Sequence, residues 1–314
     1  MRADAGALSV LAAGSSLPSR RSAWRRTRIL LGSGSARVGL AILAVIAACA
    51  VAPGWLAPTD PNEQNLLARF SRPATRTADG VLAVLGTDQL GRDILSRVIH
   101  GAKTSVLIGL SAVLVAGAIG TGLGLLAGIR GGAWDQAIMR LADMQFAFPF
   151  ILLAITVIGV LGASVRNIIL VVGLSNWFAY ARVVRAETLA VREKAFVDAA
   201  RALGVPLGAI VRRHVLPNVS ASLIVVATFG VAGAILTEAG LSFLGLGVPL
   251  AIPSWGGMLA EGRQFVDTRY WLALFPGAAL FVTVMGINLL GDALRDALDP
   301  YLVTRHTRTS MDRL

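Results

Sequence analysis

The sequence is poor in charged residues, cysteine and histidine. Only 15% of its 314 residues are charged, whereas soluble domains carry about a quarter, so the composition excludes an ordinary soluble domain. The single cysteine, Cys49, cannot close a disulfide within the chain, and the three histidines have no metal-ligand spacing. We therefore predict no metal site.

The sequence motifs of nucleotide hydrolases, zinc metalloproteases and serine hydrolases are also missing. A phosphate-binding loop needs G-x-x-x-x-G-K-[ST], and the nearest match, Gly101-Ala102-Lys103-Thr104, has alanine in the place of the essential second glycine. Neither an H-E-x-x-H nor a G-x-S-x-G string occurs. We predict no catalytic residue and no cofactor in this chain, so energy for any uphill transport must come from elsewhere.

Long uncharged runs dominate what remains. Hydrophobic residues make up 55% of the chain, and the mean hydropathy is +0.69. A helix of about 20 apolar residues crosses the hydrocarbon core of a bilayer. The runs predict an all-α polytopic membrane protein with six transmembrane helices, at about 38–59, 104–129, 144–165, 167–181, 219–240 and 270–291.

The distribution of basic residues predicts the orientation. About two thirds of the 29 Lys and Arg residues fall on the side of the N-terminus, and basic loops stay in the cytoplasm. Both termini are therefore expected inside, with 1–37 as a disordered basic arm and 301–314 as a cytoplasmic tail. The uncharged run 239–260 contains two prolines and five glycines, so we interpret it as a surface loop or re-entrant segment.

Small residues recur along the second predicted span. Ala116, Gly120, Gly124 and Gly128 are spaced four apart, on one face of a helix. Such a seam allows close contact with a neighbouring helix, either of this chain or of a partner. Prolines in the third and sixth spans, Pro149 and Pro276, predict kinks.

The loop 182–218 is the most patterned segment outside the spans. Its periodicity predicts a helix over 188–203, with Gly204 as the left-handed residue after its end. Pro206 favours the start of a second short helix, and Pro217 marks the entry to the fifth span. The pair could lie on lipid headgroups as an amphipathic hairpin or dock a cytoplasmic partner.

A family resemblance favours docking. The string Asp198-Ala199-Ala200, followed by Gly204 and, after nine residues, by His214-Val215-Leu216-Pro217, resembles the EAA loop of ABC importer permeases, E-A-A-x3-G-x9-I-x-L-P, with Asp for Glu and His for Ile. Three further blocks are similar to the peptide/nickel branch of these permeases, in the order 86–97, 238–247 and 292–300.

The resemblance implies a C-type permease subunit of a dipeptide, oligopeptide or nickel importer. It implies an ABC type I importer permease fold over 38–300, with a cytoplasmic coupling helix pair, in the bacterial inner membrane. The expected partners are a homologous second permease, two ATPase subunits that bind ATP and Mg²⁺, and an extracytoplasmic solute-binding protein. ATPase coupling is expected at Asp198, Ala199, Ala200, Gly204, Leu216 and Pro217.

The block before the second span leaves two alternatives. Asp88, Arg92 and Asp93 could form an outer gate or contact the binding protein, or the segment could be a structural turn in which the aspartates cap a helix. The substrate also stays open between dipeptides, longer peptides and nickel or another metal complex. A channel, a secondary transporter or a membrane scaffold are the rival functions, although buried ionisable residues typical of ion-driven transport are scarce.

Overall fold

The computed structural model describes residues 33–77 and 80–298, and the described part is mainly helical. A two-stranded antiparallel hairpin pairs Thr75 with Ala83. The elements are α3 (Gly34–Val51), α4 (Pro53–Leu56), the 3-10 turn η1 (Leu66–Ala68), β1 (Thr75–Arg76), β2 (Leu82–Ala83), α5 (Ile94–Arg130), α6 (Gly132–Ala147), α7 (Phe150–Leu161), α8 (Val165–Arg192), α9 (Ala195–Ala202), α10 (Leu207–Ile210), the π-helix η2 (Val211–Val215), α11 (Leu216–Phe243), α12 (Trp255–Gly262), the 3-10 turn η3 (Arg263–Phe265) and α13 (Trp271–Leu298).

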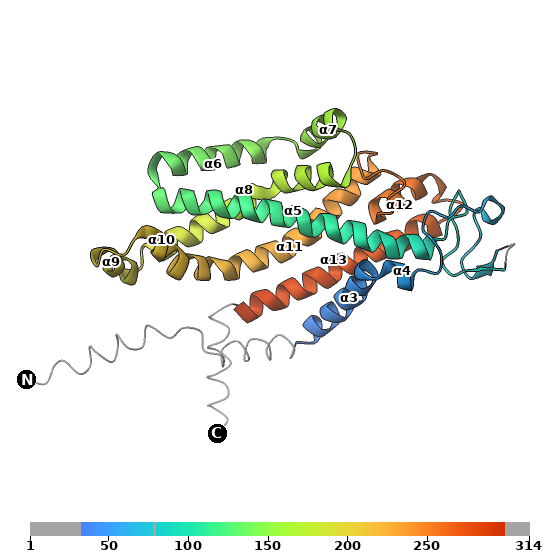
Figure 1. Cartoon of the computed structure of the whole chain (residues 1–314), viewed down its shortest axis with the longest axis horizontal. Coiled ribbons are helices and arrows are strands. Elements are labelled where there is room, and N and C mark those ends of the chain that lie inside the picture. The colour runs from blue at the N-terminus through green and yellow to red at the C-terminus, as the bar shows by residue number, and fades with distance from the viewer. Residues whose placement is uncertain (1–32, 78–79, 299–314) are drawn as a thin grey trace, which may run out of the picture.

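The long helices α3, α5, α8, α11 and α13 form an elongated bundle, with α6 against α5 and α8 (Figure 1). One end of the bundle, which we call the loop end, carries α9 and α10. The opposite end, which we call the hairpin end, carries β1, β2 and α12. The predicted all-α polytopic fold is therefore confirmed.

Five described helices are long and apolar enough to cross a membrane: α3, α5, α8, α11 and α13. The pair α6 and α7 passes the same test jointly, but its axis bends by 86° at the break. The sequence predicts a kink at Pro149, and the break between the two helices lies at that residue. Pro149 explains it, because proline lacks an N–H and drives the preceding residue, Phe148, into an extended conformation (ψ 128°).

Other helices extend beyond the predicted apolar runs. α5 begins at Ile94 rather than near residue 104, because the Asp93 side chain caps it by accepting a hydrogen bond from the Ser96 amide. α8 continues from Val165 to Arg192, far past the predicted end at 181. Charged residues end an apolar run without breaking a helical hydrogen-bond ladder, so charge-free windows underestimate these helices.

The first predicted span is interrupted near its C-terminal end. α3 already starts at Gly34, within the segment expected to be a disordered arm, and ends at Val51. Pro53 then begins the separate short helix α4, since proline suits the first turn of a helix but not its interior. Residues 1–32 and 299–314, with the rest of the predicted arm and the C-terminal tail, lie outside the described residues.

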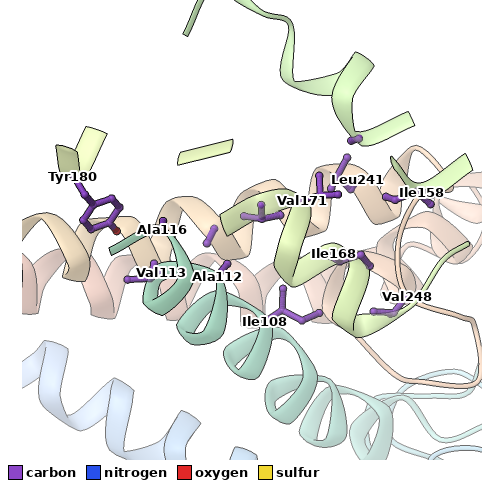
Figure 2. Packing of buried hydrophobic residues seen from close by; sticks show 13 residues of the cluster. Ile108, Ala112, Val113, Ala116, Ile158, Ile168, Val171, Tyr180, Leu241 and Val248 are labelled. Atoms are coloured by element: carbon purple, nitrogen blue, oxygen red, sulfur yellow. The ribbon is translucent and has the colours of Figure 1, made fainter. Parts of the chain in front are cut away.

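The α5–α8 contact runs along most of α8. Gly120 and Gly124 leave room only for the α8 backbone, since a Cβ at either position would collide with the carbonyl oxygen of Trp177 or Ala181. The small-residue seam therefore serves a helix of the same chain. Further along, α5, α7, α8 and α11 share an apolar core that includes Ile108, Ile168 and Leu241 (Figure 2).

Candidate functional sites

The chain between α8 and α11 folds back onto the loop end of the bundle. Val197 of α9 and Ile210 of α10 are 1% and 2% exposed, and they pack against Val184 and Val191 of α8 and Val219 of α11. A small apolar core therefore joins the two short helices to both long helices. A displacement of α9 or α10 would be transmitted to α8 and α11 through this core.

The predicted helix over 188–203 is divided. α8 ends at Arg192, and α9 starts at Ala195 after a turn in which the Lys194 amide donates to the Val191 carbonyl (3.2 Å). This turn allows Val197 to point into the apolar core. Burial of that side chain outweighs the helical propensity of the connecting residues, which is only a weak preference.

Gly204 has the left-handed conformation that its position predicts, with φ of +76°. The amides of Leu203 and Val205 on either side donate to the carbonyls of Ala199 (3.1 Å) and Ala200 (3.0 Å). Three of the expected coupling residues thus form one helix end. Gly204 reverses the chain there, while Ala199 and Ala200 accept hydrogen bonds from its two neighbours.

The other expected coupling residues lie nearby. Asp198 is exposed on α9, and Leu216 and Pro217 occupy the first turn of α11. Directly before them the backbone forms a π-helix, in which the Leu216 amide donates to the Val211 carbonyl five residues earlier. π-Helical turns are rare and frequent at functional sites.

Large apolar side chains are exposed on this loop, alongside charged ones such as Asp198, Arg212 and Arg213. Phe196, Leu203, Val205, Leu207 and Leu216 are 44%, 83%, 37%, 47% and 44% exposed. We call these five residues the loop surface. Large apolar side chains that gather on one exposed segment mark a site of contact with another protein or with lipid.

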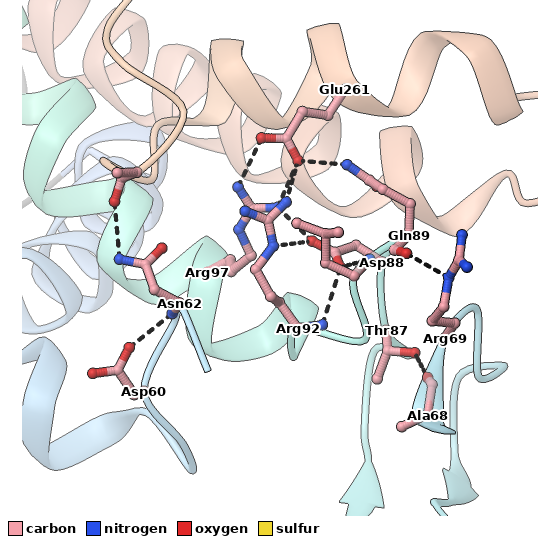
Figure 3. A network of polar contacts seen from close by, with 12 residues as sticks. Asp60, Asn62, Ala68, Arg69, Thr87, Asp88, Gln89, Arg92, Arg97 and Glu261 are labelled. Atoms are coloured by element: carbon pink, nitrogen blue, oxygen red, sulfur yellow. Dashed lines mark hydrogen bonds and ion pairs between the residues drawn. The ribbon is translucent and has the colours of Figure 1, made fainter. Parts of the chain in front are cut away.

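At the hairpin end, four charged side chains form a network that we call the charged cluster (Figure 3). Arg92 lies 2.6 Å from both Asp88 and Glu261, and Arg97 lies 2.7 Å from Asp88 and 2.8 Å from Glu261. The side chains are 3% to 11% exposed. Gln89 adds a hydrogen bond to Glu261 (3.0 Å).

The charged cluster fastens α12 to the segment before α5. Asp88 also accepts the backbone amides of Leu90 and Arg92 (2.8 and 3.0 Å), so it organises a tight turn. Gly91 completes this turn with φ of +75°, and a Cβ there would collide with the Asn65 carbonyl. These contacts give Asp88 and Arg92 a structural role within the chain.

Burial and ion pairing have opposite effects on Glu261. Burial alone would raise the pKa of this carboxyl, but the hydrogen bonds and charges of Arg97 and Arg92 outweigh it, so the pKa lies below its usual value. Glu261 is therefore ionised at neutral pH and holds both guanidinium groups in place.

Sequence reasoning missed Arg97 and Glu261 as members of this site. Arg97 stands in the block resembling the importer family, but nothing local connects it with a glutamate 164 positions later. The available signal was that Glu261 follows an uncharged segment rich in glycine and proline, where a single carboxylate needs a partner if it is buried.

Comparison with protein families gives two matches. Residues 120–303 match the model described as "Binding-protein-dependent transport system inner membrane component". Residues 21–73 match the model described as "N-terminal TM domain of oligopeptide transport permease C".

Several curated proteins are similar over most of the chain. The di/tripeptide transport system permease protein DppC of Pseudomonas aeruginosa (strain UCBPP-PA14) is 41% identical over 264 residues, covering 84% of this chain and 87% of that protein. The glutathione transport system permease protein GsiD of Escherichia coli O6:K15:H31 (strain 536 / UPEC) is 42% identical over 277 residues, covering 88% and 89%.

A solved structure shares the fold. A chain of the MetNI methionine ABC transporter, in a structure with inward-facing conformations, superposes with a TM-score of 0.52 at 19% sequence identity. The match covers 65% of this chain and 96% of that chain. At this identity the likeness concerns the arrangement of the helices.

Proposed function

Because the chain belongs to the family of binding-protein-dependent transport system inner membrane components, we propose that it forms half of the translocation pathway of an ABC importer for short peptides. The identity with permeases named for di/tripeptide and glutathione transport supports a peptide cargo. Nickel or another small metal complex is the alternative cargo, because the sequence blocks shared with the peptide branch also occur in nickel permeases.

The observation that carries the coupling role is the construction of the loop end. Its inner side is packed onto both α8 and α11, while the loop surface exposes five apolar side chains. We assign this surface to an ATPase subunit, placed in the cytoplasm by the excess of basic residues on that side of the membrane. ATP and Mg²⁺ would bind to that partner.

The mechanism follows from the packing. Closure of an ATPase dimer would push α9 and α10, and the apolar core around Val197 would pass this displacement to α8 and α11. Relative movement of these two helices would change which side of the membrane the pathway faces, as alternating access requires. Asp198, Ala199, Ala200, Gly204, Leu216 and Pro217 would act as coupling residues by keeping the short helices in position.

The remaining partners follow from the same proposal. A homologous second permease would supply the other half of the pathway, and a solute-binding protein would deliver the cargo outside the cell. In that orientation the hairpin end, with Asp88, Arg92 and Asp93, faces the binding protein. The charged cluster would hold the receiving surface in shape rather than touch the cargo, since its side chains are buried.

The proposal is tested first by assembly. The tagged chain would be purified in mild detergent from its native membranes, and the co-purifying proteins would be identified by mass spectrometry. We expect a second permease, an ATPase and a binding protein, and the ligand of that binding protein would then name the cargo. Recovery of the chain alone, from membranes that contain such partners, would contradict the proposal.

The coupling role is tested by Gly204→Val. Valine strongly disfavours the left-handed conformation that Gly204 adopts, so the helix end would be distorted. We expect dipeptide uptake by the reconstituted complex to be abolished, with a normal amount of the chain in the membrane fraction.

The matched control for that variant is Gly208→Val. Gly208 is also exposed in the same loop with open space around its Cα, but its φ is not positive. It should keep most of the uptake. Wild-type uptake by Gly204→Val, or equal loss in both variants, would remove the coupling assignment.

A further inference from the structure

A half-open groove of about 160 Å³ lies in the middle of the bundle between α8 and α11. Its floor is α5, where the side chains are short (Ala112, Val113 and Ala116). Its polar side chains are Asn176 and Tyr180 of α8 and Thr237 of α11. The volume suffices for a few water molecules or for part of a small ligand.

Tyr180 occupies a constrained position in this groove. Its side chain is 3% exposed, with the ring beside Gly117 and the Cβ beside Gly120 of α5. Gly230 of α11 makes room for the hydroxyl, since a Cβ there would collide with Tyr180 Oη. Figure 2 shows the Tyr180 side chain at one end of the apolar core shared by α5, α8 and α11.

The Tyr180 hydroxyl has no hydrogen-bond partner in the described part of the chain. A buried hydroxyl without a partner is unfavourable, so such a group calls for a specific explanation. The groove supplies one, because the residues that line it include Gly230, which stands against the hydroxyl. The hydroxyl is itself closed off in this structure, so a molecule in the groove can accept this hydrogen bond once α8 and α11 move apart.

The other polar groups complement that donor. Asn176 donates its amide to the Val172 carbonyl (2.9 Å), and Thr237 donates its hydroxyl to the Gly233 carbonyl (2.8 Å). Both residues line the groove, and with these donors engaged their side-chain oxygens keep the capacity to accept a hydrogen bond. One donor and two acceptors match a peptide group, which offers a carbonyl oxygen and an N–H.

The groove lining also excludes strongly charged ligand groups. None of its twelve described lining residues is charged. Ligand sites that are mainly apolar with a few placed polar groups suit uncharged parts of a ligand. An amide linkage meets this description, whereas the charged ends of a peptide would be left unpaired.

Resting on the proposed import of short peptides, we propose that this groove is a transport subsite for one peptide group of the cargo. Tyr180 donates to the peptide carbonyl, and Asn176 or Thr237 accepts from its N–H. Because α8 and α11 also carry the loop end, movement of α9 and α10 changes the width of the groove. Binding and release of the peptide group are thereby tied to the coupling loop.

The first test is Tyr180→Phe in the complete complex reconstituted with its ATPases, second permease and binding protein. The probe is radiolabelled alanyl-alanine, and both uptake and ATP hydrolysis are measured. Phenylalanine keeps the ring packing and removes only the hydroxyl. We expect at least a ten-fold rise in the number of ATP molecules hydrolysed per dipeptide imported. Without the hydroxyl the dipeptide would be bound less often, while the ATPases continue to hydrolyse ATP.

The ratio separates cargo binding from a merely structural role. If Tyr180 served only packing, uptake and ATP hydrolysis would fall together and the ratio would stay constant, which would overturn the proposal. The matched control is Tyr270→Phe, because the Tyr270 side chain is 58% exposed directly before α13 and lies outside the groove. It should keep the wild-type ratio.

A second variant approaches the hydroxyl from the opposite wall. Gly230→Ala places a methyl group against Tyr180 Oη, which should displace it and raise the same ratio. Gly240→Ala on the same helix meets open space and gains the same helical propensity, so it should match the wild type. A wild-type ratio in Gly230→Ala would also overturn the subsite.

Failure of the subsite differs from failure of the proposed function. A wild-type complex that imports alanyl-alanine while Tyr180→Phe imports it with equal efficiency rejects only the subsite. A wild-type complex that assembles with its partners but imports no dipeptide rejects the peptide cargo and the subsite with it.

Discussion

The two ends of the bundle are held together by opposite kinds of interaction. At the hairpin end, the charged cluster joins Asp88, Arg92 and Arg97 to Glu261 through directional ion pairs. At the loop end, an apolar core around Val197 and the neighbouring valines joins the short helices to α8 and α11. Ion pairs tolerate little displacement, whereas apolar contacts have no preferred direction.

The difference indicates how movement is distributed. Breaking one buried ion pair leaves an unpaired charge, so the hairpin end should keep one geometry. The apolar core at the loop end has no charge that movement would leave unpaired, so α9 and α10 can move together with the adjoining ends of α8 and α11. The comparison therefore predicts a rigid end and an adjustable end.

The largest effect is expected for Glu261→Ala at the rigid end. It leaves two buried guanidinium groups with Asp88 as their remaining carboxylate, and removal of one partner of a buried pair costs about 3–5 kcal/mol of unfolding free energy. Denaturant titration of the purified chain in detergent measures the loss.

The control for this variant is an exposed ion pair of similar length. Arg182 and Asp143 lie 2.7 Å apart but are 40% and 68% exposed. Asp143→Ala should therefore change the free energy of unfolding by about 0–1 kcal/mol. An equal loss of unfolding free energy in the two variants would show that burial does not make the charged cluster more stabilising than an exposed ion pair.

A smaller effect is expected at the loop end, where Val197→Ala and Leu203→Ala form a pair. Val197 is 1% exposed and Leu203 is 83% exposed, so the first should lower the free energy of unfolding by about 2 kcal/mol and the second by less than about 0.5 kcal/mol. Denaturant titration checks both values.

The same pair sharpens the assignment of the loop surface. Leu203→Ala should reduce the amount of ATPase subunit that co-purifies with the chain although its stability is unchanged. Full retention of the ATPase, with Phe196→Ala giving the same result, would mean that the loop surface is not the contact.

The smallest effect is expected from acid. The pKa of Glu261 is lower in the folded chain than the 4.5 of an unperturbed glutamate, so its contribution to stability is present above pH 4.5 and is lost as the pH falls through the folded pKa. Thermal unfolding of the wild type and of Glu261→Gln would be followed at decreasing pH. The difference between them should shrink on acidification, and a constant difference would contradict the assignment.

Periodicity and local chemistry predicted the features that depend on neighbouring residues. The left-handed Gly204 is confirmed, and Asp93 caps a helix as one of the two alternatives for its block expects, since each feature rests on a few adjacent backbone groups. The turn at Lys194 was not predicted, because its stability depends on the burial of Val197 against valines that are distant in the sequence. The same holds for Glu261, whose partners lie far away in the sequence.

The tight contact of α5 with α8 has a mechanical consequence. The 37 residues of α5 span about 55 Å at the usual rise per residue, and Gly120, Gly124 and Gly128 bring it against α8 with almost no intervening side chain. Two helices whose backbones are in direct contact are expected to move together as one rigid unit. In the proposed mechanism, a displacement of the loop end would then reach the opposite end of the bundle with little loss.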